Sequence, residues 1–312
     1  MSTIPAQITD DFRRRIAATF PEQGAGWLAR LPALLAECAE RWSLTLEPPF
    51  ALSYNYVAAA TRADGLPVVL KLGCPNPELT TEMSALRAFD GPAVCRVLET
   101  DAERGALLLE RVLPGTPLTT LVAEDDERAT AIASDLLRQL WRPPPAAHAF
   151  PSVGDWARGL PKLRERFNGG TGPLPARVFE EAEECFAWLL ATTIAPQLLH
   201  GDLHHDNILS ATSTSTRAPW LIIDAKGIVG DPGYDLGAFL YNPMPGLLEL
   251  PHPQRLLARR VDQLAEGLGM QRARVRGWGI AQAVLSACWS IADDQDWRHT
   301  ITCAEYLAAL KV

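Results

Sequence analysis

The stretch His200–Asn207 (HGDLHHDN) decides the fold, and Asp224 follows it at the end of the apolar run Trp220–Ile223. The spacing is H-x-D-x-x-x-x-N, then a β-type segment, then an acid. Phosphoryl transfer from ATP needs one carboxylate that orients and deprotonates a hydroxyl, and oxygen ligands that hold Mg²⁺ on the phosphates. We predict that Asp202 is the base and that Asn207 and Asp224 bind the metal, because Mg²⁺ prefers oxygen ligands.

The histidines of the same stretch also raise the possibility of a zinc site. His200 and His204 are four residues apart and converge on one metal ion only if they lie on a helix. Gly201 and its turn-like surroundings argue against that helix. We therefore expect His200 to be structural, and His204 and His205 to line the mouth of the substrate site.

The composition sets the broad class of the protein. The 312 residues are enough for one large domain or two moderate ones, with 47% hydrophobic and 21% charged residues. A net charge of −8 argues against nucleic acid as a partner. It is compatible with a cationic small substrate, although an acidic surface also serves solubility alone.

Cysteine spacing and the N-terminus indicate the compartment. The six cysteines, at positions 38, 74, 95, 185, 288 and 303, form no C-x-x-C pair. Cys38, Cys185 and Cys288 lie in apolar surroundings, where reduced core thiols are expected. The first residues lack a basic segment followed by an apolar one, and no apolar run approaches membrane-spanning length. We expect a cytoplasmic protein with no membrane partner, either a monomer or a homodimer.

Hydrophobic periodicity predicts a β-rich first part of the chain. Two helices come first, at residues 10–19 and 22–42. Strands and one helix follow in the order βββαββ, at residues 44–53, 54–61, 66–72, 78–89 (the helix), 93–99 and 106–111. The turn Ala63-Asp64-Gly65 joins the second and third strands as a hairpin.

Beyond the break Leu113–Pro117 helical patterns dominate. Helices are predicted at 117–123, 126–141, 154–167, 175–192, 253–268, 271–292 and 296–310. Strands are predicted at 197–199, 208–210 and 220–224, with a hairpin tip at 211–218. We therefore expect three regions: N-terminal helices (1–43), a nucleotide-binding sheet (44–112) and a helical part with the catalytic loop and acceptor site (113–312).

A phosphoryl-transfer site also needs a lysine on the third strand and a glutamate on the next helix. Lys71, after Val68-Val69-Leu70, supplies the first, and Glu82 supplies the second. A lysine after three apolar residues can simply mark a strand end, but the downstream motif favours the phosphate role. Glu78 stays open as an alternative partner for Lys71.

The remaining nucleotide contacts are expected around the first strands and after the fifth. Ser53 and Asn55 lie where a phosphate-binding loop belongs, although no G-x-G-x-x-G is present. The adenine should pair with the backbone of the segment that contains Glu110 and Val112.

Three blocks of this sequence resemble the aminoglycoside phosphotransferase family. They are 199–209 (LHGDLHHDNIL), 222–237 (IIDAKGIVGDPGYDLG) and 281–290 (AQAVLSACWS), and the likeness is greatest to the streptomycin 6-phosphotransferase and hydroxyurea-kinase-like branch. The resemblance implies an α+β, protein-kinase-like bilobal fold, with an antiparallel sheet and one helix in the N-lobe and a mainly helical C-lobe. It also implies ATP and Mg²⁺ as cofactors, with Asp202 as base, Asn207 and Asp224 as metal ligands and Lys71 as a phosphate contact.

Further details follow from the resemblance. Asp235 looks like the family aspartate that braces the catalytic loop. Ala225-Lys226-Gly227 stands where protein kinases have Phe-Gly, so no protein-kinase activation switch is implied. The sequence has no A-P-E segment, which argues against protein substrates.

The acceptor pocket should lie in the helical lobe and face Asp202. Carboxylates and indoles there could pair with and stack on guanidinium or ammonium groups. The candidates besides His205 are Asp155, Trp289, Asp293, Asp294, Asp296 and Trp297. The alternative is that the cluster at 293–297 is only a solvated helix end.

The sequence therefore predicts an ATP-dependent O-phosphotransferase that acts on a hydroxyl of a small cationic, streptomycin-like antibiotic. A second hypothesis is a metabolic small-molecule kinase of the same fold. A third is a nucleotide-binding pseudokinase that serves as an interaction module, which the intact Lys71, Asp202, Asn207 and Asp224 disfavour.

Overall fold

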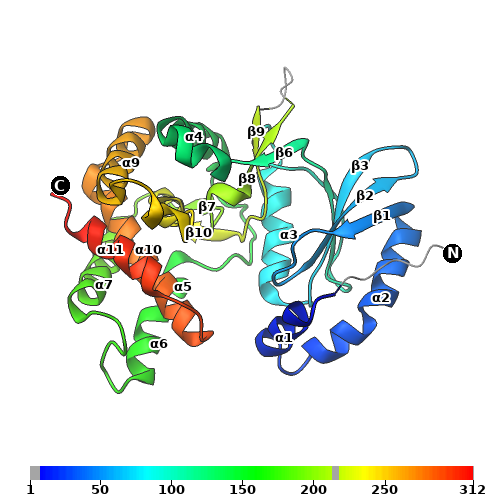
Figure 1. The fold of residues 1–312 in the computed structure, drawn as a ribbon, viewed down its shortest axis with the longest axis horizontal. Helices are drawn as coiled ribbons and strands as arrows, with labels where there is room; N and C mark the ends of the chain where they lie inside the picture. The colour runs from blue at the N-terminus through cyan, green and yellow to red at the C-terminus, as the bar shows by residue number, and fades with distance from the viewer. Residues whose placement is uncertain (1–7, 213–217, 312) are drawn as a thin grey trace. The chain divides into compact units, whose positions relative to one another are not determined.

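The structure, a computed structural model, describes residues 8–212 and 218–311. Its contacts divide the chain into two units (Figure 1). The N-terminal unit is Met1–Asp90 with Cys95–Leu113, and the C-terminal unit is Gly91–Val94 with Pro114–Val312. The fold is protein-kinase-like, with an antiparallel sheet in the first unit and mostly helices in the second.

The N-terminal unit is built on a five-stranded antiparallel sheet in the order β1-β2-β3-β5-β4. The strands are β1 (Leu44–Pro49), β2 (Tyr56–Arg62), β3 (Pro67–Leu72), β4 (Val97–Asp101) and β5 (Ala106–Glu110). One helix, α3 (Pro77–Phe89), lies between β3 and β4 in the chain, so the predicted βββαββ order is confirmed. β1 ends at Pro49, before the predicted Ser53, because proline has no N–H to donate to the ladder.

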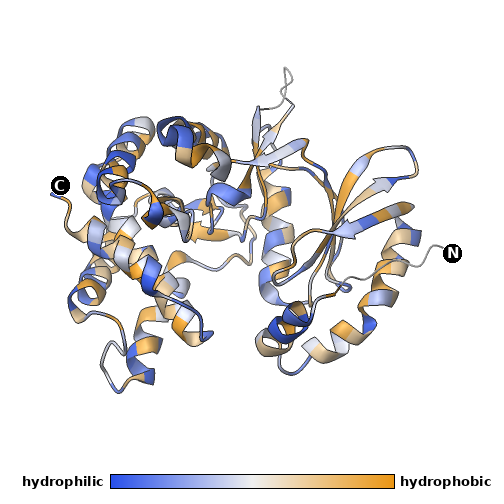
Figure 2. Ribbon diagram, in the orientation of Figure 1, coloured by the Kyte–Doolittle hydropathy of each residue, from blue (hydrophilic) through white to orange (hydrophobic). Residues whose placement is uncertain are grey.

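Strand β3 shows how the sheet separates its two faces. Val68, Leu70 and Leu72 alternate along one face and are fully buried. Lys71 points to the opposite face, opposite Val57 of β2 in the register. The central strands are correspondingly hydrophobic in Figure 2. One side of the sheet therefore forms a core while the other presents the predicted phosphate-binding lysine.

The two N-terminal helices belong to this core. α1 (Asp10–Thr19) and α2 (Gly24–Arg41) pack their apolar stripes, including Phe12 and Leu31, in one cluster with Tyr56 and Leu70 of the sheet. The chain at residues 8–43 therefore shares a unit with the sheet, and the expected division at residue 43 does not separate two bodies.

The C-terminal unit is mainly helical. Its helices are α4 (Thr119–Leu140), α5 (Val153–Ala157), α6 (Gly159–Arg166), α7 (Ala176–Ala191), α8 (Asp235–Tyr241), α9 (Pro253–Leu268), α10 (Arg272–Ala292) and α11 (Arg298–Ala308). α10 is buried on nearly all sides between Val275 and Ile291, and it contacts α6, α7, α8, α9 and α11. A helix that is apolar all round belongs in the centre of a domain, and α10 is the axis of this unit.

Two short sheets carry the loops that matter for chemistry. β8 (Ile208–Ala211) pairs with β9 (Trp220–Ile222) and with β6 (Pro114–Pro117). β7 (Gln197–Leu199) pairs with β10 (Ile228–Gly230). Residues 200–207, the predicted catalytic loop, follow β7, and the segment of Asp224 connects β9 to β10. The pairing of β7 with β10 therefore brings the two segments together.

Several boundaries differ from the prediction. The break predicted between helices 117–123 and 126–141 is present, because the backbone of Asp125 inside α4 is not helical (φ −154°, ψ 72°) and kinks the helix there. The predicted helix 154–167 is broken into α5 and α6. The sequence patterns missed α8, β6 and β10. The predicted hairpin tip at 211–218 lies largely outside the described residues, although the strands on either side of it do pair.

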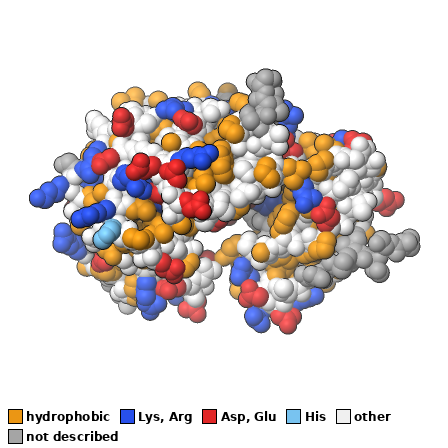
Figure 3. Space-filling model, turned by 45° about the horizontal axis from the view of Figure 1, so that its top comes forward, with side chains coloured by type: hydrophobic (Ala, Val, Ile, Leu, Met, Phe, Trp, Pro, Cys, Tyr) orange, Lys and Arg blue, Asp and Glu red, His pale blue; other side chains and the backbone are white. Residues whose placement is uncertain are grey.

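Two further features are the distribution of surface charge and the apolar character of the helices. On the face of the molecule in Figure 3, acidic and basic side chains are interleaved over the C-terminal unit. In the described parts of the chain, no helix combines the length and apolar character that a bilayer crossing requires.

We expect Leu31→Ala to lower the free energy of unfolding by about 2–5 kcal/mol, because Leu31 is fully buried between α2 and the sheet. The neighbouring exposed Arg30→Ala should change it by less than about 0.5 kcal/mol. Urea denaturation followed by circular dichroism measures both. Equal effects of the two substitutions would show that α2 is not part of the core.

Candidate active site

The N-terminal unit contributes a buried ion pair. Lys71 Nζ lies 2.6 Å from Glu82 Oε1, and both side chains are less than a tenth exposed. Glu78, the alternative partner, is exposed in the first turn of α3. The predicted pairing of Lys71 with Glu82 is therefore present, and the pair fixes the ammonium group on the face of β3 that the N-terminal helices leave uncovered.

The other predicted nucleotide contacts lie at strand ends of the same unit. Asn55 closes the β1–β2 loop, and its amide oxygen fills the space above Gly73, where a Cβ would approach it to 2.3 Å. Gly73 is two residues beyond Lys71, so Asn55 lies near the end of β3 that carries the lysine. Ser53 is exposed in the loop. Glu110 ends β5 and accepts a hydrogen bond from the Arg96 backbone N–H at 2.8 Å.

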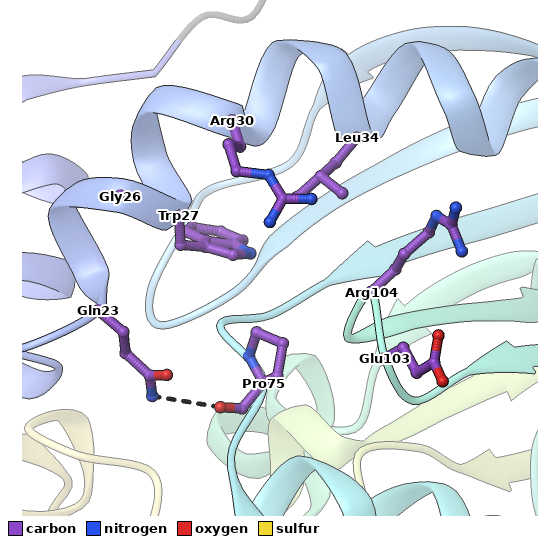
Figure 4. A pocket seen from close by; sticks show the side chains of 8 residues that line it. All are labelled: Gln23, Gly26, Trp27, Arg30, Leu34, Pro75, Glu103 and Arg104. Atoms are coloured by element: carbon purple, nitrogen blue, oxygen red, sulfur yellow. Dashed lines mark hydrogen bonds between the residues drawn. The ribbon is translucent and has the colours of Figure 1, made fainter.

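A hollow of about 380 Å³ lies elsewhere in this unit (Figure 4). Trp27 and Arg30 of α2 line one side of it, and Pro75 and Arg104 line the other. Gln23 donates to the Pro75 carbonyl across one end at 3.2 Å. None of the predicted nucleotide contacts lines this hollow, so we do not assign the nucleotide to it.

In the C-terminal unit the predicted catalytic loop begins with His200, whose ring forms hydrogen bonds to backbone groups. The His200 ring is fully buried. Its Nδ1 accepts from the Asp202 N–H at 3.1 Å, so Nε2 carries the proton and donates to the Ile223 carbonyl at 2.8 Å. Burial lowers the pKa of His200 to about 4. Both ring nitrogens are used, which supports the predicted structural role of His200.

Asp235 holds the start of this loop. Its buried carboxylate accepts the backbone N–H groups of His200 at 3.0 Å and Gly201 at 2.8 Å, and the Trp141 indole N–H at 3.0 Å. Gly201 has φ +90°, a conformation that residues with a Cβ rarely adopt. The turn delivers Asp202, which is partly exposed.

The loop is joined to the segment of Asp224 by further bonds. The Ile223 N–H donates to the Asn207 carbonyl at 2.9 Å, and the Lys226 N–H donates to the His200 carbonyl at 2.7 Å. Asp224 has a left-handed backbone (φ 60°). Asp202, Asn207 and Asp224 are thus presented from two chain segments that hydrogen bonds tie together.

The donor set fits a magnesium ion. Asn207 Nδ2 donates to the Asp202 carbonyl at 3.0 Å, which leaves the amide oxygen as the atom available to a cation. Asp224 offers a carboxylate, and Lys226 Nζ lies 3.6 Å from it, so this carboxylate already attracts a cation. Hard oxygen donors of this kind suit Mg²⁺. Asp231 is a poorer candidate, because it binds the Trp278 indole N–H at 2.8 Å and pairs with Arg274.

Comparison with known proteins agrees with this geometry. The family described as aminoglycoside/hydroxyurea antibiotic resistance kinase matches residues 42–294. The streptomycin 6-kinase of Streptomyces glaucescens is 32% identical over 289 residues, 92% of each chain. The hydroxyurea phosphotransferase of Kitasatospora aureofaciens is 32% identical, over 94% of this chain and 81% of that one. The chain belongs to the aminoglycoside/hydroxyurea antibiotic resistance kinase family.

Solved structures show the same fold. A choline/ethanolamine kinase family protein from Mesorhizobium loti has a TM-score of 0.62 at 18% identity, covering 97% of this chain and 94% of that one. An aminoglycoside phosphotransferase from Streptomyces rimosus, solved with ADP and streptomycin, has a TM-score of 0.53 at 20% identity, covering 82% and 98%. This kinase is therefore a phosphotransferase on a protein-kinase-like scaffold.

The structure places His205, one of the predicted acceptor residues, away from the surface. The prediction that His205 lines the substrate mouth is wrong, because its ring is fully buried and stacks on Phe239 with centroids 4.1 Å apart. His204, its neighbour, is partly exposed. Local sequence could not separate the two, since the partners of His205 come from distant helices.

The predicted acidic residues occupy helix ends. Asp155 forms a capping box with Ser152, which lowers the pKa of this exposed carboxyl. Asp293 caps the C-terminus of α10, and Asp296 accepts from the Arg298 N–H at the start of α11. The carboxylates of Asp155 and Asp296 therefore have local partners at helix starts. Trp297 caps α11 beside them.

The sequence reasoning missed Trp156. Its ring lies against Gly201, where a Cβ would approach it to 3.1 Å, and it meets Trp289 edge to face with centroids 5.6 Å apart. Trp289 is 38% exposed. The two indoles therefore form an aromatic wall that begins next to the catalytic loop. A tryptophan directly after the capping box was the only local signal, and it did not point to this contact.

Asp235 should make the stability of the kinase depend on pH. Burial outweighs its hydrogen bonds and raises its pKa to about 6. Between about pH 4 and 6 the folded protein holds a proton that the unfolded chain has released, so the contribution of this group is full below pH 4 and is lost as pH rises through 6. Relative to Asp235→Asn, the wild type should lose about 3 kcal/mol of unfolding free energy across that window. Urea titrations at several pH values measure this, and parallel curves would contradict it.

Proposed function

We propose that this kinase transfers the γ-phosphoryl group of ATP to a hydroxyl of a cationic aminoglycoside of the streptomycin type. The observation that carries the proposal is the constellation of Asp202, Asn207 and Asp224 on two segments that backbone hydrogen bonds join, with Asp235 holding the start of the first segment. The chain aligns over nearly its full length with two Streptomyces proteins named streptomycin 6-kinase, each 32% identical to it.

Each residue has a role in the proposed reaction. Asp202 orients the acceptor hydroxyl and takes its proton as the new oxygen–phosphorus bond forms and the bond from phosphorus to ADP breaks. Asn207 and Asp224 would hold Mg²⁺, which supplies charge neutralisation at the phosphates when bound. Lys71, fixed by Glu82, places its ammonium group against the phosphates nearer the nucleoside. Ser53, Asn55, Glu110 and Val112 stay candidates for the remaining nucleotide contacts.

The aromatic wall supports an acceptor with ring faces. Trp156 and Trp289 meet nearly at right angles, with an interplanar angle of 85°. Such a corner takes the apolar face of a saccharide or aminocyclitol ring, and indole faces also attract guanidinium groups. Asp293, Asp294 and Asp296 lie beyond the same end of α10 and would attract a cationic ligand over a longer range.

A second candidate function is phosphorylation of hydroxyurea, favoured by the relative with that name. Hydroxyurea is small and uncharged, so an extended indole corner and nearby carboxylates would add little to its binding.

An inactive nucleotide-binding module is less favoured. The buried Lys71–Glu82 pair carries a desolvation cost that such a module has no need to keep.

A turnover screen tests the proposed function. ATP consumption should depend on an added acceptor and be greater with streptomycin than with hydroxyurea or neutral hydroxylated metabolites. Asp202→Asn should lower kcat by about 10²–10⁴-fold with ATP binding retained, because the positioned base is lost. Asp206→Asn, an exposed acid in the same loop, serves as control. Near-normal turnover in Asp202→Asn would remove the assignment of the base.

The aromatic wall of Trp156 and Trp289 gives a separate test. Trp156→Ala and Trp289→Ala should each raise the KM for streptomycin by about tenfold, the size of one aromatic or cation–π contact. The KM for ATP should stay within about twofold, and Trp188→Ala, a comparably exposed tryptophan of α7, should change neither. Higher salt should also raise the streptomycin KM of the wild type. If only Asp293→Asn, Asp294→Asn or Asp296→Asn raises it, the acceptor lies further along the α10–α11 end than proposed.

A further inference from the structure

We propose that Arg260 is a positioning residue for phosphoryl transfer, which holds the far end of the catalytic loop through His205. The proposal rests on the roles proposed above for Asp202 and Asn207. Asp235 accounts for the start of the loop, at His200 and Gly201. The other end, where Asn207 lies, needs its own anchor.

Arg260 is a fully buried guanidinium with every edge in use. It lies in α9, and its Nε and Nη2 bind the Asp126 carboxylate of α4, with Nη2 to Oδ1 at 2.6 Å. Its Nη1 donates to the carbonyls at the end of α8: Phe239 and Leu240 at 3.1 Å and Asn242 at 2.6 Å. The group therefore fixes α4, α8 and α9 to one another.

The remaining donor of this guanidinium meets the catalytic loop. Arg260 Nη2 lies 3.2 Å from His205 Nε2. A guanidinium can only donate, so Nε2 must accept and the imidazole proton must sit on Nδ1. Burial and the adjacent Arg260 lower the pKa of His205 well below its usual value, so the ring is neutral. Phe239 closes the other side by stacking on the imidazole.

His205 transmits this anchor to the proposed metal ligand. It begins the short 3₁₀ turn His205–Asn207, and Asn207 in turn donates from Nδ2 to the Asp202 carbonyl at 3.0 Å. The loop is thus held near both ends of α8. Asp235 in the first turn of α8 binds the Gly201 N–H, and Arg260 of α9, which binds the carbonyls at the end of α8, contacts His205. Displacing either contact would move Asp202 and Asn207 together.

Lysine cannot replace this arginine. The contacts require a planar fork that reaches a carboxylate, three carbonyls and an imidazole at once, and an ammonium group has three donors on a flexible stem. Arg259, the neighbour, also reaches Asp126 at 2.8 Å, but its side chain is 41% exposed, and its ion pairs among the described residues are with Asp126 and Glu127 of α4. Arg259→Lys is therefore the matched control.

The test combines activity with a readout that needs no substrate. Arg260→Lys and His205→Leu should each lower kcat about tenfold or more, since small displacements of catalytic groups have effects of this size. The KM for ATP should stay within about twofold. Amide hydrogen exchange of the 201–207 segment should speed up in both variants of the full chain, with Arg259→Lys like the wild type. His205→Gln, which restores an acceptor for Arg260, should recover most of both properties.

The double variant separates positioning from general destabilisation. If Arg260 acts through His205, adding His205→Leu to Arg260→Lys should cause little further loss of kcat. His205→Leu leaves the Arg260–Asp126 pair in place, so it decides the question should Arg260→Lys fail to fold. Wild-type exchange and kcat in folded His205→Leu would overturn the proposal, as would additive losses in the double variant. Because exchange is measured without an acceptor, failure of the proposed substrate leaves this readout intact.

Discussion

The C-terminal unit depends on the buried carboxylate of Asp235. Burying a charged group away from water is costly unless hydrogen-bond donors replace the water. Asp235 has no exposed surface, and it is tolerated because two backbone N–H groups and an indole N–H surround it. Those donors do not fully replace water, which is why its pKa stays raised. The loop that follows β7 has a positive-φ glycine and no regular ladder of its own. Without this acceptor, the buried N–H groups of His200 and Gly201 would lose the partner that they have here, which would destabilise the turn.

The N-terminal unit solves a similar problem with an ion pair. Lys71 is nearly buried on a strand that is otherwise apolar, and its ion pair with Glu82 of α3 makes the charge tolerable there. Replacing such a pair by hydrophobic residues is often neutral or stabilising in proteins. The N-terminal unit therefore keeps a buried ion pair at a position where apolar residues would often serve stability as well. Function is the straightforward reason for that choice in a phosphotransferase.

The sequence predicted the parts of the site that chemistry constrains locally. Asp202, Asn207 and Asp224 could be proposed because phosphoryl transfer uses those residue types at a short spacing. Lys71 could be proposed because it lies on the third predicted strand. Helix α8 was missed because it is short and buried on every side, so it shows no polar face and no amphipathic period. His205 was misjudged because its partner Arg260 is 55 residues away. The acids at 155 and 296 drew attention as charges, but their hydrogen bonds cap helices.

The extent of the hydrophobic core differs from the extent of the recognisable family. The family match begins at residue 42, after both N-terminal helices have ended, whereas the core of the sheet begins at Phe12. A chain cut at the start of the match would present Tyr56, Val68 and Leu70 to water, on the reverse side of the strands that hold Lys71. The segment that the family model matches is therefore shorter than the segment that builds the core behind Lys71. Helices α1 and α2 therefore belong to the core that supports the sheet.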